Sequence, residues 1–250
     1  MADALATYPD AGRLRVLIGC ETSGVMRRAF TARGFDAWSC DVLPADDGSN
    51  RHLRGDVRGY LADGWDMLVV CHPPCTRLCN SGVRWLDSPL QRAAPDEATP
   101  DEAARWPGLG MDERQTIMRR LLAEGAALFA ACWQAPVQRV AVENPIIHRH
   151  AKALLPADLP KPQIVQPWWF GEPAKKATGF YLRGLPKLTP TNRLPLPAKG
   201  SDEDKRWQAV HRASPGPDRW KIRSKTFEGV ADACADQWGR HALAEMETAQ

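Results

Sequence analysis

The sequence predicts an α/β protein whose sheet is parallel and doubly wound. Apolar runs of strand length alternate with segments of helical spacing from Arg15 to Val142. Two of the runs, residues 65–70 and 137–142, have the composition of strands that are buried on both faces. A short motif with polar side chains closes each run. Such strand ends face the ligand crevice of an open α/β sheet, so we expect both motifs at one site.

Length and composition narrow the class of protein. The 250 residues, 44% hydrophobic and 25% charged, suffice for one large domain with a small appendage. No apolar run approaches the length of a membrane-spanning helix, and the first residues lack the regions of a signal peptide. Seven cysteines are scattered without a disulfide framework, so we expect free thiols in a cytoplasmic protein.

The amino-terminal elements are expected to follow one another as strand, tight loop, helix and strand. Gly34 is expected to end the helix, because glycine is the usual residue just past a helix carboxyl terminus. The ranges are 15–18 for the first strand, 19–24 for the loop, 25–33 for the helix and 35–40 for the second strand, which Asp41 follows.

The alternation continues to Val142 and then becomes sparser. We expect a short helical piece at 53–62, strands ending at Val70 and Val142 with a helix at 112–133 between them, strands at 163–166 and 179–182, and a last helix at 227–246. Residues 76–110 have little periodicity and are long for a passive connection, which predicts a lid or a disordered loop.

Charge is distributed unevenly along the chain. The net charge is +3, yet residues 183–225 hold eleven Lys or Arg against four Asp or Glu. This surplus predicts a polyanionic partner for that proline-rich segment. We therefore expect a main domain at 13–183, a small basic lobe at 184–222, and a carboxyl-terminal segment at 223–250 that returns to the main domain.

The first strand-end motif, Cys71-His72-Pro73-Pro74-Cys75, presents a thiol on a rigid turn. The two prolines fix the backbone and remove its amide donors, which suits a nucleophile at Cys75. A thiolate adds to an electron-poor carbon such as C6 of cytosine far better than a hydroxyl does. The alternative is that Cys75 is a small core residue, as most strand-end cysteines are.

The second motif, Glu143-Asn144-Pro145, offers a carboxyl group at the end of a buried strand. Burial should raise the pKa of Glu143 and favour the protonated form, which can donate a hydrogen bond to N3 of a pyrimidine. That hydrogen bond would draw electron density from the ring during attack at C6. The alternative is that Glu143 caps the next helix. Together the two motifs indicate covalent activation of a pyrimidine.

These motifs resemble those of the cytosine C5 methyltransferases, in particular short forms found in bacterial viruses. Pro73-Pro74-Cys75 is similar to the nucleophile loop of that family, and Glu143-Asn144 to its Glu-Asn-Val motif, with Pro145 in place of valine. The resemblance spans about residues 14–182, together with 223–226 and the last helix. It implies the Rossmann-like fold of class I methyltransferases that use S-adenosylmethionine, and methyl transfer to C5 of cytosine in DNA. S-adenosylhomocysteine would be the product.

The same resemblance implies roles for further residues. Asn144 would order the strand-end loop, and Lys175 or Lys176 would hold the cytosine carbonyl. Cofactor-binding residues would be Gly19, Cys20, Glu21, Thr22, Ser23 and Gly24 in the first loop, Asp41 and Val42 at the ribose, Asp56 and Val57 at the adenine, and Pro73.

The chain departs from the family at several positions. Glu21 and Ser23 stand where the family prefers glycine, so Glu21 is a candidate for the ammonium group of the cofactor. Thr76 replaces a glutamine, and lysines replace arginines, which loses the planar bidentate fork. The lobe is much shorter than the recognition domain of the family, which predicts a short or degenerate recognition site.

The expected partner is DNA containing cytosine, bound by a monomer. The target base must leave the stack to be reached, and the loop after Cys75, with Ser81 and Arg84, would close over it. In and after the lobe, phosphate contacts and stacking would come from Arg206, Trp207, Trp220, Lys221 and Arg223. The alternative is that the tryptophans form the core of the lobe itself.

Other readings of the motifs lead to other functions. Cys71, His72, Cys75 and Cys79 are typical zinc ligands, but their spacing fits no closed structural site, so we expect no metal. Amino methyltransferases of DNA have an aromatic residue after Pro-Pro, where this chain has a cysteine. Two alternatives stay open. One is the same chemistry on a free nucleotide or RNA, or with a modified sulfonium donor. The other is a non-catalytic DNA-binding relative that occupies sites against restriction.

Overall fold

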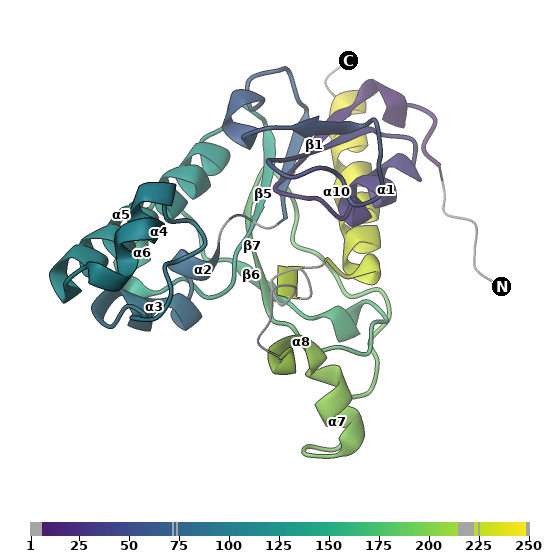
Figure 1. Cartoon of the computed structure of the whole chain (residues 1–250). Coiled ribbons are helices and arrows are strands. Elements are labelled where there is room, and N and C mark those ends of the chain that lie inside the picture. The colour runs from purple at the N-terminus through teal and green to yellow at the C-terminus, as the bar shows by residue number, and fades with distance from the viewer. Residues whose placement is uncertain (1–6, 72, 74, 215–222, 225, 249–250) are drawn as a thin grey trace.

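A seven-stranded sheet forms the centre of the molecule (Figure 1). The computed structural model describes residues 7–71, 73, 75–214, 223–224 and 226–248. The strand order is β3-β2-β1-β4-β5-β7-β6. The strands are β1 (Arg15–Gly19), β2 (Asp36–Asp41), β3 (His52–Arg54), β4 (Met67–Val70), β5 (Arg139–Glu143), β6 (Gln163–Val165) and β7 (Thr178–Arg183).

The sheet is mixed, whereas the sequence predicts a parallel one. The first five strands pair in parallel, but β7 runs antiparallel to both β5 and β6. The connection from β6 to β7 explains the reversal, because it contains only the 3-10 turn Pro167–Trp169 and no α-helix. A parallel pair normally needs a helical crossover, whereas an antiparallel pair does not.

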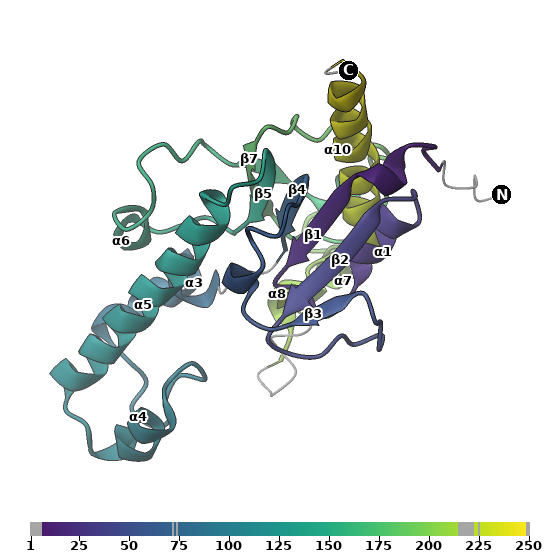
Figure 2. The same ribbon diagram turned by 90° about the horizontal axis from the view of Figure 1, so that it is seen from above.

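Helices cover both faces of the sheet, as the doubly wound prediction requires (Figure 2). On one face lie α1 and α10, and on the other lies α5. The α-helices are α1 (Val25–Thr31), α2 (Cys75–Leu78), α3 (Asn80–Asp87), α4 (Pro100–Arg105), α5 (Met111–Trp133), α6 (Arg149–Lys152), α7 (Asp202–Trp207), α8 (Ala209–Arg212) and α10 (Glu228–Thr248). In the described ranges, none of the helices is both long and apolar enough to cross a membrane.

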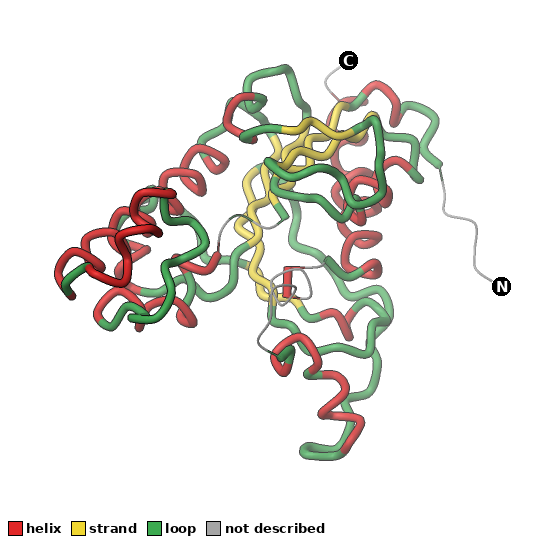
Figure 3. The backbone as a smooth tube through the Cα atoms, viewed as in Figure 1, coloured by secondary structure: helices red, strands yellow, loops and turns green. Residues whose placement is uncertain are grey.

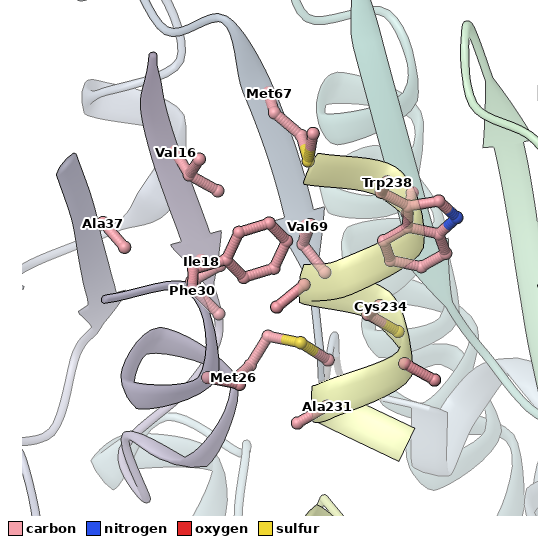
Figure 4. Packing of buried hydrophobic residues seen from close by; sticks show 14 of the residues in the cluster. Val16, Ile18, Met26, Phe30, Ala37, Met67, Val69, Ala231, Cys234 and Trp238 are labelled. Carbon is pink, nitrogen blue, oxygen red and sulfur yellow. The ribbon is translucent and has the colours of Figure 1, made fainter. Parts of the chain in front are cut away.

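Each face of the sheet has its own hydrophobic core. Against α1 and α10, the strands present alternate residues such as Val16, Ile18 and Val69, which pack with Phe30 and Trp238 (Figure 4). The intervening strand residues face α5, where Phe129 is fully buried among them. Burial on both faces explains why the strand sequences are continuously apolar rather than alternating.

Residues 76–110 are helical in large part, so the expectation of a disordered loop is wrong, whereas a role as a lid stays a prediction (Figure 3). The segment folds into α2, α3, α4 and the 3-10 turn Trp106–Gly108. Thr99 caps α4 through a hydrogen bond from the Glu102 backbone amide, and the Glu102 side chain accepts from the Thr99 amide. The helices are too short for hydrophobic periodicity to reveal them.

The helical piece expected at 53–62 is also largely wrong. Leu53 lies in β3, where it pairs with Cys40, and only Val57–Gly59 forms a 3-10 turn. Asp56 caps this turn by accepting the backbone amide of Arg58. Pairing with the neighbouring strand therefore outweighs the local helical preference of this segment.

Candidate active site at the carboxyl ends of β4 and β5

The two strand-end motifs lie next to each other at one edge of the sheet. Strands β4 and β5 are adjacent and parallel, with Val70 opposite Val142. Glu143 therefore follows at the same level as Cys71, whose amide donates to the Gly19 carbonyl at 2.9 Å. Cys75 begins α2 a few residues later. The backbone at Cys75 is described, whereas its side chain, His72 and Pro74 lie outside the described residues.

Several hydrogen bonds hold the segment that carries Cys75 against the loop that follows Glu143. The His148 amide donates to the Leu78 carbonyl at 3.0 Å, and the Asn80 amide donates to Ile146 at 3.3 Å. Cys79 and Ile147 form an antiparallel bridge between these two contacts. The two motifs are thus parts of one fastened unit rather than separate loops.

His148 strengthens this connection with its buried ring. Its Nδ1 atom accepts the Ala151 amide at 3.1 Å, which caps the start of α6. An accepting Nδ1 assigns the proton to Nε2, which then donates to the Arg77 carbonyl of α2 at 2.8 Å. One side chain therefore joins α6 to α2.

Glu143 lies in a pocket on the α1 and α10 side of the sheet. The pocket has about 320 Å³ of empty space out to its open mouth, and its lining comprises Met26, Cys71, Glu143, Lys176, Thr178, Phe180, Thr226, Phe227 and Val230. Glu143 is 6% exposed, and burial raises its pKa to about 7. The charge of Lys176 opposes that rise, and Cys79 adds to it. The raised pKa expected for this carboxyl is therefore present, and its cause is desolvation.

Asn144 is fully buried next to Glu143, and its side-chain oxygen and nitrogen have no hydrogen-bond partner among the described residues. Its backbone amide donates to the Gly179 carbonyl at 2.9 Å. A Cβ atom at Gly179 would lie 2.6 Å from the Asn144 carbonyl oxygen, so this close approach needs glycine. The backbone of Asn144 therefore joins the loop after Glu143 to β7.

The two candidate lysines go to different places. Lys176 lines the pocket with Glu143. Lys175 instead forms an ion pair through Nζ with Asp204 of α7, outside the pocket lining. Of the two lysines, Lys176 is the one that lies beside Glu143.

The loop after β1 makes the expected sharp turn. Cys20 and Gly24 have positive φ angles of 55° and 65°. Glu21 has no exposed surface, and its carboxylate accepts the amides of Met26 at 2.7 Å and Arg27 at 3.2 Å. Burial nevertheless raises its pKa to about 7. Glu21 therefore caps α1, and this geometry does not favour its expected contact with a cofactor ammonium group.

The rest of that loop and the ends of β2 and β3 lie on the same edge of the sheet. Thr22 donates to Asp46 at 3.1 Å, and Ser23 lies 3.4 Å from Glu21 between Oγ and Oε1. Asp41 is half-buried and accepts the Leu43 amide at 3.0 Å, and burial raises its pKa. Val42 beside it is 64% exposed.

The remaining cofactor candidates are less open to a ligand. The Asp56 carboxylate is paired with Arg58, which lowers its pKa. Val57 is buried, and a Cβ atom at Gly19 would lie 3.0 Å from its Cγ2 atom, so Gly19 allows close packing with Val57. Pro73 is buried.

The expected DNA contacts divide into exposed cations and one buried ring. Arg84, Arg206 and Arg223 are exposed, and Arg84 stacks over Trp85 at 4.3 Å from the ring centroid. Trp207 is only 5% exposed, so the stacking role expected for it is wrong and it serves the core of the lobe. Trp220 and Lys221 lie outside the described residues, as does the Ser81 side chain.

Sequence reasoning missed much of the pocket wall. Met26, Phe180, Phe227 and Val230 line it, but in the sequence they are ordinary apolar residues of helices and strands. It also missed Arg149 and Lys152, exposed cations on α6 directly after the Glu143 loop. A helix as short as α6 shows no hydrophobic periodicity in the sequence. The sequence does show a strand, then Glu-Asn, then a cluster of basic residues.

Among the described residues, the free thiols include Cys20, Cys40, Cys71, Cys132 and Cys234, and no three His, Cys, Asp or Glu side chains gather as a metal site would require. No known protein-family model matches the sequence, and no curated protein matches it either.

Proposed function

We propose that this protein transfers a methyl group from S-adenosylmethionine to C5 of cytosine in DNA through a covalent adduct with Cys75. The observation that carries the proposal is the fastened unit formed by α2, which begins at Cys75, and the loop after the buried acid Glu143. A nucleophile and a raised-pKa acid from adjacent strand ends are what attack on a pyrimidine needs.

The strand order also supports this class of enzyme. The dinucleotide-binding Rossmann fold has the order 3-2-1-4-5-6, all parallel. Here an antiparallel β7 lies between β5 and β6, an arrangement typical of class I methyltransferases. The order reverses between β1 and β4, where open α/β sheets bind their ligands.

The residues at this crevice fit an adenosyl donor. Asp41 at the end of β2 offers a carboxylate, and the exposed Val42 offers an apolar surface beside it. Gly19, Cys20 and Gly24 form the turn between β1 and α1. When bound, S-adenosylmethionine would supply an electrophilic methyl group on a sulfonium.

Cys75 and Glu143 would activate the cytosine ring together. The Cys75 thiolate adds to C6, while protonated Glu143 donates to N3 and stabilises the negative charge that develops on the ring. The adduct is an enamine that is nucleophilic at C5. After C5 is methylated, a water molecule takes the proton from C5, the electrons of that C–H bond form the C5–C6 double bond, and the bond between Cys75 and C6 breaks to regenerate the thiolate. Lys176 would contact the carbonyl of the base.

Incubation with labelled donor and DNA, followed by mass spectrometry of the nucleosides, tests this function. The wild-type protein should produce 5-methyl-2′-deoxycytidine in DNA, and Cys75→Ser should reduce the product below detection while donor binding by calorimetry persists. Cys132→Ser is the matched control, because this buried thiol lies on α5, outside the segment that carries Cys75, and should be dispensable. Substantial activity of Cys75→Ser, or transfer to a nitrogen atom, would disprove the covalent mechanism.

The same assay distinguishes the alternatives. A larger mass added to cytosine would identify a modified donor, and product on RNA or free nucleotide but not on DNA would change the acceptor. DNA binding without any modified nucleoside would indicate a non-catalytic DNA-binding protein.

A further inference from the structure

We infer that Asp204, in the small lobe, is a positioning residue for Lys176 in the pocket and acts through the neighbouring Lys175. The inference deepens the proposed function, because it rests on Lys176 as the contact to the target base. The described residues that line the pocket do not include Asp204 or any other residue of α7, so the link depends on contacts along the chain.

The carboxylate of Asp204 is the centre of a small buried network. Asp204 is 4% exposed, and its oxygens accept from Lys175 Nζ, from the Gly200 amide at 2.9 Å and from Gln208 Nε2 at 3.0 Å. The bond with Lys175 is the largest of the effects that lower the pKa of Asp204 to about 2. A carboxylate only accepts, so it can satisfy three donors that a side-chain amide cannot satisfy together.

Backbone bonds fix the segment that both lysines share. The Lys175 amide donates to the Trp207 carbonyl at 2.7 Å, at the end of α7, and the Lys176 amide donates to Gln166 Oε1 at 3.1 Å. Trp207 is buried beneath this contact. The segment is thus held by α7 on one side and by Gln166 on the other, and the Lys176 side chain leaves it toward Glu143.

A change in the position of Lys176 has a measurable effect on Glu143. Among the described residues, the charged and titratable groups coupled to Glu143 are Lys176, Cys79 and Cys71, and of these three Lys176 is the one that favours the ionised form. If Lys176 moves away, the pKa of Glu143 must rise further. The titration of Glu143 therefore reports on the position of Lys176 without any donor or DNA.

The experiment is a carbon-13 NMR titration of the full-length protein with labelled glutamate carboxyls, in which Glu143→Gln assigns the signal. Lys176→Met should raise the pKa of Glu143. Asp204→Asn and Lys175→Met should each raise it in the same direction by a smaller amount. In the double variant Asp204→Asn/Lys175→Met the two effects should not add, because both substitutions break the same contact between Lys175 and Asp204.

Lys205→Met is the matched control, because it breaks the exposed ion pair with Asp202 on the same helix and should leave the titration unchanged. Lys175→Met leaves Asp204 with its two other hydrogen-bond donors, so this variant can replace Asp204→Asn in the test if Asp204→Asn folds poorly. An unchanged pKa of Glu143 in both Asp204→Asn and Lys175→Met, with a shift in Lys176→Met, would overturn the inference. So would the absence of a shift in Lys176→Met. Failure of the proposed methyl transfer would not affect these results, so the two ideas fail separately.

Discussion

At the scale of single residues, two buried carboxyl groups have the same pKa of about 7 for partly different reasons. Glu21 is fully buried, but it accepts two backbone amides from the start of α1, which partly offset desolvation. For Glu143 the group that opposes desolvation is a charge, Lys176, rather than a backbone amide. In the proposed reaction, Glu143 is therefore the carboxyl whose ionisation would respond to a base bound in the pocket.

The stability of the protein should depend on the ionisation of Glu143. Its folded-state pKa of about 7 exceeds the unfolded value of 4.5, so its contribution is fully present below pH 4.5 and is lost as pH rises to about 7. Glu143→Gln should remove this loss and stabilise the protein at pH 8 by at most about 3 kcal/mol, with little effect at pH 4. Chemical denaturation at both pH values measures the difference. An equal effect at both would contradict the raised pKa.

The rate of methyl transfer should depend on the same proton. Protonated Glu143 is the form that donates to N3, so kcat/KM should fall by about tenfold per pH unit well above pH 7. Rates measured on a short duplex between pH 6 and pH 9 would show this limb. A rate that stays constant across that range would exclude Glu143 as the proton donor.

At the scale of elements, the position of Cys75 depends on how tightly α3 packs on α2. A Cβ atom at Gly82 of α3 would lie 1.7 Å from the Thr76 carbonyl oxygen, so the two backbones touch at this point. Side chains elsewhere hold the pair in place, including Arg77, which pairs with Glu97 at 2.6 Å. The turn that carries Cys75 is thus held in place by the segment that follows it in the sequence.

Gly82→Ala should therefore displace the turn. The methyl group meets backbone rather than a flexible side chain, so we expect a loss of about 1–3 kcal/mol in stability together with a large loss of activity. Gly108→Ala is the control, since a Cβ atom there would meet nothing within 4 Å. Thermal denaturation and the nucleoside assay should separate the two variants, and wild-type activity in Gly82→Ala would show that the turn tolerates movement.

Long helices and continuously apolar strands could be predicted from the sequence, whereas short helices could not. The long α5 and α10 and the apolar strands β1, β4 and β5 lie close to their expected positions. The short α2 and α3 were missed because packing against α5 stabilises them, and α4 was missed because it depends on its capping box, with none of its residues buried. In the same way, the motifs of Cys75 and Glu143 could be read from the sequence, but the burial of Trp207 and the separation of Lys175 from Lys176 depend on tertiary contacts.

At the scale of the whole molecule, exposed cations lie on two sides of the strand-end site. Arg84 lies on α3 and Arg206 on α7, and both are exposed. The helices α3 and α7 come from segments far apart in the chain and lie on different sides of the strand ends (Figure 1). A duplex across the site would meet both.

Replacing Arg84 and Arg206 with Gln should weaken DNA binding and reduce its salt dependence. Each lost phosphate contact should lower the slope of log affinity against log salt by about 0.9. Fluorescence anisotropy with a short duplex at several salt concentrations measures this slope. Arg13→Gln is the control, because Arg13 precedes β1 and lies near the opposite edge of the sheet. A slope equal to that of the wild type would show that the two arginines do not contact phosphates.

The reversed direction of β7 changes the order in which the side chains at the site and their strands occur in the sequence. In the parallel strands, the polar side chains at this edge follow the strand in the sequence. Strand β7 begins at the same edge, so Lys176 precedes its strand in the sequence. The chain therefore forms the cation first and the strand that supports it afterwards. A change of length between Gln166 and Thr178 would shift that cation directly, whereas a change just after Arg183 would emerge at the far end of the sheet.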